Sequence, residues 1–447
     1  MARLTFPSTF LWGAATAAYQ IEGSPLADGA APSIWHEWSH TPGKIVDGTN
    51  GDVACDHFRL WRDDIRHMKD MGLTAYRFSV SWPRIFPEAG RLNHKGLDFY
   101  SRLVDGLREA GIEPWVTLFH WDTPVWLQRL GGFTRRLAVD HLVEFGSAMF
   151  KAIGDRVASW MTLNEPSAYA TAGYVLGVFP PGRKMDLEGS FRTSHHLLVG
   201  HARLSEAARA LLKGGRVGIA LSQAWHAPHR PDKERDRKAA DFVDAALNRF
   251  YRDPLFLGRY PEELIRKVAR FLPTGFEKDA EAMKGSADFL GVNYYSRVQI
   301  RHSFLRPFIH AKEIKDSRAP RSAMWEIYPE GISRLLLLLK DRYGNPPCYI
   351  TENGYPYQEP PGRDTRHDPE RITYMESHIA QVGKALAQGV DCRGYFHWSL
   401  MDNFEWAFGR TMRFGLLRTD FVTQERQWRA SAAWYRDLIR RGWMEVA

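Results

Sequence analysis

The sequence predicts an α/β fold, a single (β/α)8 barrel spanning residues 1–447, because three features agree. Short runs rich in β-branched and aromatic residues alternate about eight times with helical patterns. Several of these runs are apolar at consecutive positions, which is typical of strands covered on both faces in a parallel sheet. Many helical patterns end in a glycine just before the next run, as at Gly72, Gly111 and Gly344, where a left-handed backbone ends a helix. Eight parallel units favour a closed barrel, because closure leaves no sheet edge.

The predicted elements follow one another without a linker or a repeat array. We expect strands at 11–16, 75–82, 114–121, 159–165, 217–223, 288–295, 348–352 and 394–400. We expect helices at 56–71, 97–109, 137–153, 193–212, 241–250, 330–342, 370–387 and 428–441. In the first helix, Phe58, Trp61, Ile65 and Met68 form one apolar stripe. The irregular, Pro- and Arg-rich stretches around 226–237 and 297–325 are interpreted as loops on the barrel rim. An open doubly wound sheet is the alternative, but the G-x-G-x-x-G turn expected after its first strand is missing.

Charge and composition exclude several classes of function. The 60 Lys and Arg residues exceed the 52 Asp and Glu residues, giving a net charge of +8, yet the basic residues are scattered and form no stripe for nucleic acid. Cys55, Cys348 and Cys392 are odd in number and lack metal-ligand spacing, as expected of thiols in a reducing compartment. No stretch approaches the ~18 apolar residues needed to span a bilayer, and the start has no apolar signal core. We therefore expect a soluble, cytoplasmic protein with no nucleic-acid or membrane partner.

Polar and aromatic residues gather near the carboxyl ends of the predicted strands, where the active site of such a barrel is built. Tryptophan faces stack on sugar C–H surfaces, and amides, carboxylates and histidine hydrogen-bond hydroxyl groups. Two glutamates at one centre are the machinery of glycosidic bond cleavage. The pattern includes no Cys/His metal cage and no Ser-His-Asp set with nucleophile-elbow spacing. These strand-end and loop residues are Arg77, Trp82, His120, Trp121, Asn164, Glu165, Asn293, Tyr294, Tyr295, Glu352, His397, Trp398, Asp402, Asn403, Glu405 and Trp406.

Longer motifs carry a resemblance to a known family. FLWGAATAAYQIEGS occupies 10–24, TLNEP occupies 162–166 and YITENG occupies 349–354, with RFSVSW, FHWD, NYY, HWSL and DNFEW between and after them. With these motifs the chain closely resembles glycoside hydrolase family 1, the β-glucosidase and β-galactosidase family, over essentially its whole length. The three longer motifs are similar to the family's amino-terminal signature, acid/base motif and nucleophile motif, respectively.

The resemblance implies a role for each site residue. Glu352 corresponds to the nucleophile, which Arg77 and Tyr294 hold charged and aimed, and Glu165 corresponds to the general acid, which later acts as base. We also infer that ionised Glu352 raises the pKa of Glu165 by like-charge repulsion, which keeps Glu165 protonated for the first step. The other residues expected to contact the substrate are Asn164, Gln20, His120, Trp121, Asn293, Trp325, Trp398, Glu405, Trp406 and Phe414. Among these, Trp398 is the expected stacking floor and Trp325 lies on the leaving-group side.

The resemblance implies a retaining β-glycosidase. Its expected substrates are small-molecule β-glycosides with terminal β-D-glucosyl residues, and also β-D-galactosyl or β-D-fucosyl residues, in disaccharides, short oligosaccharides or aryl and alkyl glycosides. No cofactor or metal is expected. A β-galactosidase-dominant or transglycosylating member of the family is the alternative. Two other classes stay open: a metal-dependent barrel enzyme with His120, Glu165, Glu352 and His397 as ligands, and a non-catalytic sugar-binding protein.

Overall fold

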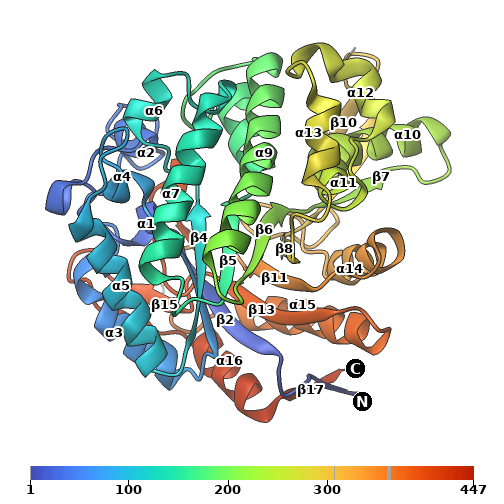
Figure 1. Cartoon of the computed structure of the whole chain (residues 1–447). Helices are drawn as coiled ribbons and strands as arrows, with labels where there is room; N and C mark the ends of the chain where they lie inside the picture. The colour runs from blue at the N-terminus through green and yellow to red at the C-terminus, as the bar shows by residue number, and fades with distance from the viewer. Residues whose placement is uncertain (1, 307, 360–363, 447) are drawn as a thin grey trace.

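The computed structural model describes residues 2–306, 308–359 and 364–446, and its centre is a closed barrel of parallel strands (Figure 1). The last barrel strand pairs with the first, with Gly394 opposite Leu11 and Trp398 opposite Ala15, so the sheet has no edge. This confirms the predicted (β/α)8 barrel. In order around the barrel, the strands are β2 (Leu11–Ala15), β3 (Ala75–Ser79), β4 (Glu113–Phe119), β5 (Ser159–Asn164), β6 (Arg216–Ser222), β8 (Phe289–Asn293), β11 (Cys348–Asn353) and β13 (Cys392–Trp398).

Long helices form a layer outside the strands. Figure 1 shows α3, α5, α7 and α9 around one side of the barrel and α14, α15 and α16 around the other. In α3 the predicted stripe faces inward, since Trp61, Ile65 and Met68 are buried and Phe58 is half-buried. The outer helices are α3 (His57–Asp70), α5 (His94–Glu109), α7 (Leu137–Ile153), α9 (Leu187–Leu211), α11 (Phe250–Leu257), α14 (Glu330–Tyr343), α15 (Pro369–Ala387) and α16 (Ala430–Arg441).

Shorter elements join the strands to the outer helices and build the two ends of the barrel. The short α-helices are α1 (Ala18–Ile21), α2 (Ile34–Ser39), α4 (Trp82–Ile85), α6 (Val125–Arg129), α8 (Pro166–Ala170), α10 (Glu234–Asp244), α12 (Glu262–Val268) and α13 (Phe276–Met283). The 3₁₀ and π turns are η1 (Ala27–Gly29), η2 (Gly132–Thr134), η3 (Thr171–Leu176), η4 (Ala245–Arg249), η5 (Ala269–Phe271) and η6 (Trp406–Phe408). The second strand was predicted to run to Trp82 but ends at Ser79, because Trp82 and Pro83 begin α4.

The region between β6 and α14 differs most from the prediction. The stretches interpreted as rim loops contain a three-stranded sheet of β7 (Trp225–Pro228), β9 (Arg297–His302) and β10 (Ala311–Ile314). The predicted helix 241–250 is the centre of a longer run of α10, η4 and α11. Ala239 and Ala240 of α10 pack on Ile300 and Ala311 of the small sheet, and this separate apolar cluster holds the sheet in place.

Three two-stranded sheets complete the described chain: β1 (Ala2–Thr5) with β17 (Trp443–Val446), β12 (Tyr357–Gln358) with β14 (Met412–Arg413), and β15 (Leu417–Thr419) with β16 (Arg426–Trp428). The first pair brings the two ends of the chain side by side (Figure 1). Within the described residues, no helix combines the length and the apolar character needed to cross a bilayer.

Aromatic side chains fill the interior of the barrel. The ring of Trp115 on β4 lies 4.6 Å from Tyr349 on β11, 5.1 Å from Phe396 on β13 and 5.2 Å from Phe289 on β8. Large rings packed at this density resist sliding of one strand past another. The strand ends that carry the polar residues are therefore rigidly placed.

Candidate active site

Glu352 lies at the carboxyl end of β11 with both carboxylate oxygens hydrogen-bonded. Arg77 Nη1 donates to Oε1 over 2.6 Å, and Tyr295 Oη donates to Oε2 over 2.7 Å. The carboxylate is almost fully buried, and the Arg77 guanidinium has no exposed surface. Because both donors favour the charged form of Glu352, they aim this carboxylate and oppose its protonation.

Arg77 ties four barrel strands together beneath this carboxylate. Its Nε donates to Thr117 Oγ1 on β4, and Nη1 also donates to the Thr351 carbonyl. Its Nη2 donates to Asn164 Oδ1 over 2.6 Å. Three nitrogens of the guanidinium therefore have hydrogen-bond acceptors, and Glu352 is its ionic partner. These contacts offset the cost of burying the charge.

The tyrosine prediction is wrong by one residue. Tyr294 Oη donates to the Tyr328 carbonyl, on the outer side of the barrel, whereas Tyr295 contacts Glu352. Side chains alternate along an extended chain, so Asn293 and Tyr295 face the interior and Tyr294 faces the surrounding helices. The same alternation, applied to the motif NYY, would have identified the second tyrosine.

The chain directly after Glu352 is tightly held where it leaves the barrel. Asn353 is the last residue of β11, and its amide donates to the Tyr294 carbonyl and to Tyr374 Oη. Gly354 is required by close packing, since a Cβ at this position would lie 1.8 Å from the Trp398 carbonyl oxygen. The strand exit is thus held by hydrogen bonds and by a contact that only glycine allows.

Glu165 follows β5 in a left-handed conformation, with φ of 43°. Its amide donates to the Ala220 carbonyl on β6, and its Oε1 accepts a 2.9 Å hydrogen bond from Asn293 Nδ2. A non-glycine residue with this φ is strained, and such strain gathers at functional sites. Here it turns the side chains of two consecutive residues, Asn164 and Glu165, into the same cavity.

The two glutamates line one cavity of about 490 Å³ at the carboxyl ends of the strands. Arg77 and Gln20 are not among the lining residues, but they contact Glu352 and Glu405, which are. Of the residues given a role in catalysis or binding, all but Tyr294 line this cavity or have a side chain that contacts a residue that does, whereas the strand-end residues Trp82 and Asp402 pack elsewhere, against Phe145 and Arg429. The residues with such a role that line the cavity are His120, Trp121, Asn164, Glu165, Asn293, Trp325, Glu352, Trp398, Glu405, Trp406 and Phe414.

Burial and like charge shift the pKa of the carboxyl groups. Burial is the larger cause and the charge of Glu352 the second in raising the pKa of Glu165 to about 8. Repulsion, the cause expected from the sequence, therefore acts but is not the largest. Burial also raises the pKa of Glu352, against the opposing effects of Arg77 and Tyr295. Because only Glu352 of the two contacts a guanidinium directly, protonation is favoured on Glu165 over Glu352.

His120 is held as a neutral imidazole with one free donor. Asn164 Oδ1 accepts from Arg77 and Asn293, which orients this amide so that its Nδ2 donates to His120 Nε2 over 2.9 Å. The proton of His120 therefore lies on Nδ1, for which the described residues provide no hydrogen-bond partner. Burial, aided by the Arg77 charge, lowers the pKa of His120 well below its usual value.

A second set of polar atoms surrounds Glu405. Gln20 Nε2 lies 2.9 Å from the Phe404 carbonyl and 3.2 Å from Glu405 Oε2, while Gln20 Oε1 has no hydrogen-bond partner within the described chain. Burial, with repulsion from Glu352, raises the pKa of Glu405 to about 8. Free acceptors and donors of this kind suit a ligand rich in hydroxyl groups.

Tryptophan rings form one wall beside these polar atoms. Trp398 and Trp406 each lie 5.9 Å from the His120 ring, in near-parallel orientation, and Trp121 lies 4.9 Å from Trp406. On the opposite side, Trp325 lies 4.8 Å from Tyr295 and 6.0 Å from Phe414. The cavity thus offers flat apolar faces beside hydrogen-bonding groups, which is the combination that binds sugar rings.

The mouth of the cavity is apolar, a feature that the sequence motifs did not indicate. Leu176 and Val178 line it although they are 56% and 49% exposed, and Phe179, Met324 and Phe408 also line the cavity. These residues come from the end of η3 and the segment after it, from the segment between β10 and α14, and from η6. Exposed apolar side chains at the entrance of a pocket mark a binding surface.

The metal-ligand hypothesis from the sequence does not match the orientation of the histidines. His120 Nε2 accepts from Asn164, and His397 Nε2 lies 3.3 Å from the Phe414 carbonyl. Glu352 is held by Arg77 and Tyr295. Among the described residues, no three of the four proposed ligands bring their ligand atoms within 4.8 Å of one another.

We expect Tyr295→Phe to shift the acidic limb of kcat/KM to higher pH by about one to two units, because loss of a hydrogen bond to a charged carboxylate raises its pKa. The measurement is a pH profile with an aryl β-glucoside. Tyr294→Phe is the matched control, since its hydroxyl bonds the Tyr328 carbonyl, and its profile should coincide with the wild type. A shift in Tyr294→Phe without one in Tyr295→Phe would restore the original prediction.

Comparison with known proteins adds independent findings. The model of glycosyl hydrolase family 1 matches residues 2–443. Beta-glucosidase A of Thermotoga maritima is 44% identical over 445 residues, covering 98% of this chain and 99% of that protein. Beta-glucosidase 42 of Arabidopsis thaliana is 39% identical over 465 residues, covering 98% and 94%. The solved family 1 β-glucosidase from Thermotoga maritima superposes with a TM-score of 0.96 at 43% identity over all of both chains. That enzyme has also been solved in complex with deoxynojirimycin, with a TM-score of 0.95 at 44% identity over 99% of this chain and 100% of the other.

Proposed function

The chain belongs to glycosyl hydrolase family 1, and from this premise we propose that it is a β-glucosidase that cleaves terminal β-D-glucosyl residues with retention of anomeric configuration. It is an O-glycoside hydrolase. The observation that carries the proposal is the position of Glu165 and Glu352 in one cavity, where Arg77 contacts Glu352 and burial raises the pKa of Glu165. An acid and a nucleophile beside one sugar site are what double displacement requires.

In the first step, a Glu352 oxygen attacks the anomeric carbon and forms an ester bond. The bond from this carbon to the leaving-group oxygen breaks, and Glu165 gives its proton to that oxygen. In the second step, Glu165 takes a proton from water, whose oxygen attacks the same carbon and displaces Glu352. Two inversions at one carbon retain its configuration.

The environment of Glu165 lets one group serve both steps. While Glu352 is ionised, its charge adds to burial and keeps Glu165 protonated. The ester formed by Glu352 has no charge, so the pKa of Glu165 falls and the group becomes able to accept a proton from water. The enzyme is thereby returned to its starting protonation state.

The sugar is recognised by the polar atoms that lack protein partners. We assign Gln20 Oε1, His120 Nδ1 and the Glu405 carboxyl group to hydroxyls of the glycosyl ring, and the Trp398 face to stacking. A hydroxyl can both donate and accept, so it satisfies the acceptor on Gln20 and the donor on His120.

The apolar mouth favours an apolar leaving group. Leu176, Val178 and Met324 offer little to hydrogen-bond a second sugar, whereas an aryl or alkyl group would bury apolar surface against them. We propose aryl and alkyl β-glucosides as good substrates alongside β-linked disaccharides.

A panel of aryl glycosides and β-linked disaccharides tests the proposed function, with product anomers followed by NMR. We expect β-D-glucose as the first product, before mutarotation produces the α anomer. Initial release of the α anomer would refute retention, and a higher kcat/KM for galactosides than for glucosides would favour the β-galactosidase alternative. Transfer of glucose to added alcohols measures transglycosylation.

We expect Glu405→Gln to change the ratio of kcat/KM between a glucoside and a fucoside by about tenfold, because a buried hydroxyl left without a suitable hydrogen-bond partner costs about 1–3 kcal/mol. The two sugars differ at the 4- and 6-positions, which this carboxyl group is proposed to contact. Glu425→Gln is the control, since Glu425 is exposed and does not line the cavity. Equal ratios in wild type and Glu405→Gln would contradict this assignment.

A further inference from the structure

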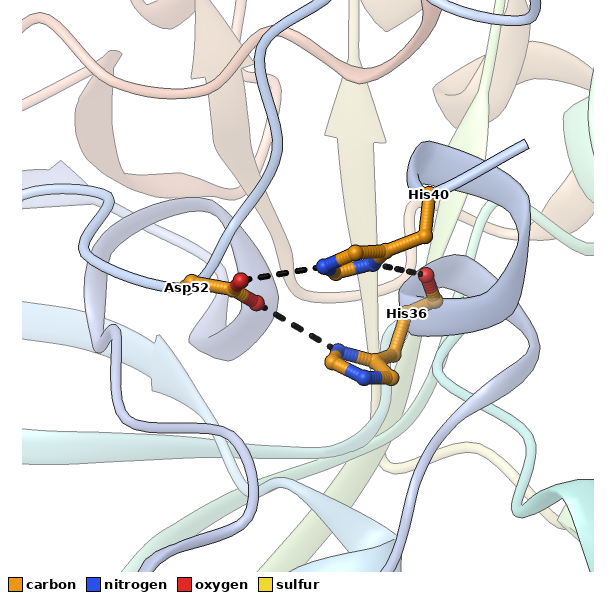
Figure 2. Close-up of side chains that lie close together, drawn as sticks. All are labelled: His36, His40 and Asp52. Carbon is orange, nitrogen blue, oxygen red and sulfur yellow. Dashed lines mark hydrogen bonds and ion pairs between the residues drawn. The ribbon is translucent and has the colours of Figure 1, made fainter. Parts of the chain in front are cut away.

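Three side chains with metal-binding atoms converge outside the sugar cavity, on α2 and on the segment that follows it (Figure 2). His36 lies on α2 and His40 directly follows its last residue, so the two rings lie 4.3 Å apart on the same side of the chain, and Asp52 faces both imidazoles. We propose that His36, His40 and Asp52 form a binding site for a divalent transition-metal ion of the Zn²⁺ type. This proposal is independent of the proposed function.

The distances fit a tetrahedral ion. Asp52 Oδ1 lies 3.5 Å from His36 Nδ1, and Asp52 Oδ2 lies 3.0 Å from His40 Nε2. All three ligand atoms lie within 4.8 Å of one another. With metal–ligand bonds of about 2.0–2.2 Å, neighbouring ligands of a tetrahedral Zn²⁺ are about 3.3–3.6 Å apart. Small movements of exposed side chains are enough to bring the atoms to bonding distance.

His40 is oriented by a hydrogen bond that suits a metal ligand. Its Nδ1 lies 2.7 Å from the His36 carbonyl oxygen and donates to it, which leaves the lone pair of a neutral ring on Nε2. This lone pair faces Asp52 Oδ2, so two acceptors face each other unless a cation or a proton lies between them. A ligating histidine commonly donates its other N–H to a backbone carbonyl. The competitors at Nε2 are a proton and the Asn50 amide, which lies 3.4 Å away.

His36 contributes a second nitrogen that is free to bind. Its Nδ1 and the facing Asp52 Oδ1 are buried atoms, and neither has a hydrogen-bond partner among the described residues. The side chains of His36, His40 and Asp52 are 16%, 39% and 44% exposed, so an ion can enter and keep a water molecule as its fourth ligand.

Such an ion would brace elements that lie behind the sugar site. Helix α2 also carries Trp35, whose ring lies 4.5 Å from Trp406, and Ser39, whose hydroxyl bonds Tyr19 Oη beside Gln20. Asp52 accepts the Ser24 amide through its carbonyl, so the ion would link this segment to α2. None of the three ligands lines the sugar cavity, so the ion is expected to stabilise the fold and not to take part in bond cleavage.

The test uses the full chain without a histidine tag, stripped with EDTA and titrated with ZnCl₂ or CoCl₂ at pH 7.5. We expect one ion bound per chain by calorimetry, visible absorption bands of tetrahedral Co²⁺, and a rise in Tm of about 2 °C or more at saturating Zn²⁺. His40→Ala and Asp52→Asn should each weaken binding about 100-fold or more and abolish the rise in Tm.

His141→Ala is the matched control, because His141 faces a single carboxylate, Glu144, at 3.5 Å and so offers only a two-ligand pair. It should bind Zn²⁺ as the wild type does. Measuring every variant in EDTA first separates loss of metal binding from loss of folding. Absence of saturable binding by the wild type, or equal binding by Asp52→Asn, would overturn the proposal. Activity that persists after EDTA treatment is expected and leaves the proposed function unaffected.

Discussion

Glu352→Gly is expected to abolish turnover of an aryl β-glucoside, lowering kcat on the order of 10⁵-fold or more, as when other covalent nucleophiles are removed. The variant has no group that can form the ester at the anomeric carbon. The residues that contact the sugar in our assignment and the tryptophan wall are unchanged, so the substrate still binds. The measurement is release of the phenol by the purified variant, free of wild-type contamination.

A small external nucleophile should partly restore this variant. Glycine leaves space beside Arg77, where azide can attack the anomeric carbon of an activated glucoside once and give the α-glucosyl azide. A single inversion is diagnostic, because the wild type inverts twice. Formation of a β-azide, or turnover close to that of the wild type, would show that Glu352 is not the nucleophile.

The control for Glu352→Gly is a second buried glutamate that is also paired with an arginine. Glu22 accepts from Arg84 Nη2 over 3.1 Å, and neither residue lines the sugar cavity. Removing either carboxylate leaves a buried guanidinium unpaired, at a cost of about 3–5 kcal/mol. Glu22→Gln is therefore expected to lose stability but keep most of its turnover. If both variants lost turnover to a comparable extent, misfolding would explain the lost activity of Glu352→Gly.

The barrel could be predicted because each βα unit repeats the same physical pattern. Strands such as β4 and β5 are buried along nearly their whole length, so their sequences are largely apolar at consecutive positions. Helix α3 has the apolar stripe that is typical of a helix with one buried face. The sheet of β7, β9 and β10 lacks these signals, because its strands are short and partly exposed, and β9 and β10 contain charged residues. Its pairing depends on contacts with α10, which a local pattern does not contain.

The site could be predicted as a set of residues but not in its contacts. Glu352 and Glu165 were found because strand ends of a barrel converge. Tyr294 was predicted in place of Tyr295 because the prediction used the motif NYY but did not apply the alternation of side chains along an extended chain. This alternation places Asn293 and Tyr295 on one face. The left-handed conformation of Glu165 could not be predicted, since nothing in TLNEP requires a positive φ before the proline.

Glu165→Gln is the second variant with a large expected effect, and the effect should depend on the leaving group. We expect kcat/KM for alkyl glucosides or cellobiose to fall about 10²–10⁴-fold, the usual contribution of a general acid. Glutamine has the same shape and can still accept from Asn293, so the loss is one of proton donation. An activated dinitrophenyl glucoside, which leaves without protonation, should show little change in the first step. The intermediate should then accumulate as a burst of phenol, because water also lacks its base.

The pH profile gives an independent test of the same residue. Burial and the Glu352 charge raise the pKa of Glu165 to about 8, and the acid acts only while protonated, so wild-type kcat/KM should fall as pH rises through this value. Glu165→Gln should lack this basic limb, since glutamine has no proton to lose.

Glu405→Gln is the matched comparison, because Glu405 is also buried with its pKa raised to about 8, yet it contacts the sugar in our assignment. The Glu405→Gln variant should keep the basic limb of the pH profile. It should lower kcat/KM by the same factor for substrates with good and with poor leaving groups. A Glu165→Gln profile that keeps the limb, or an equal loss with both kinds of leaving group, would mean that another group is the acid.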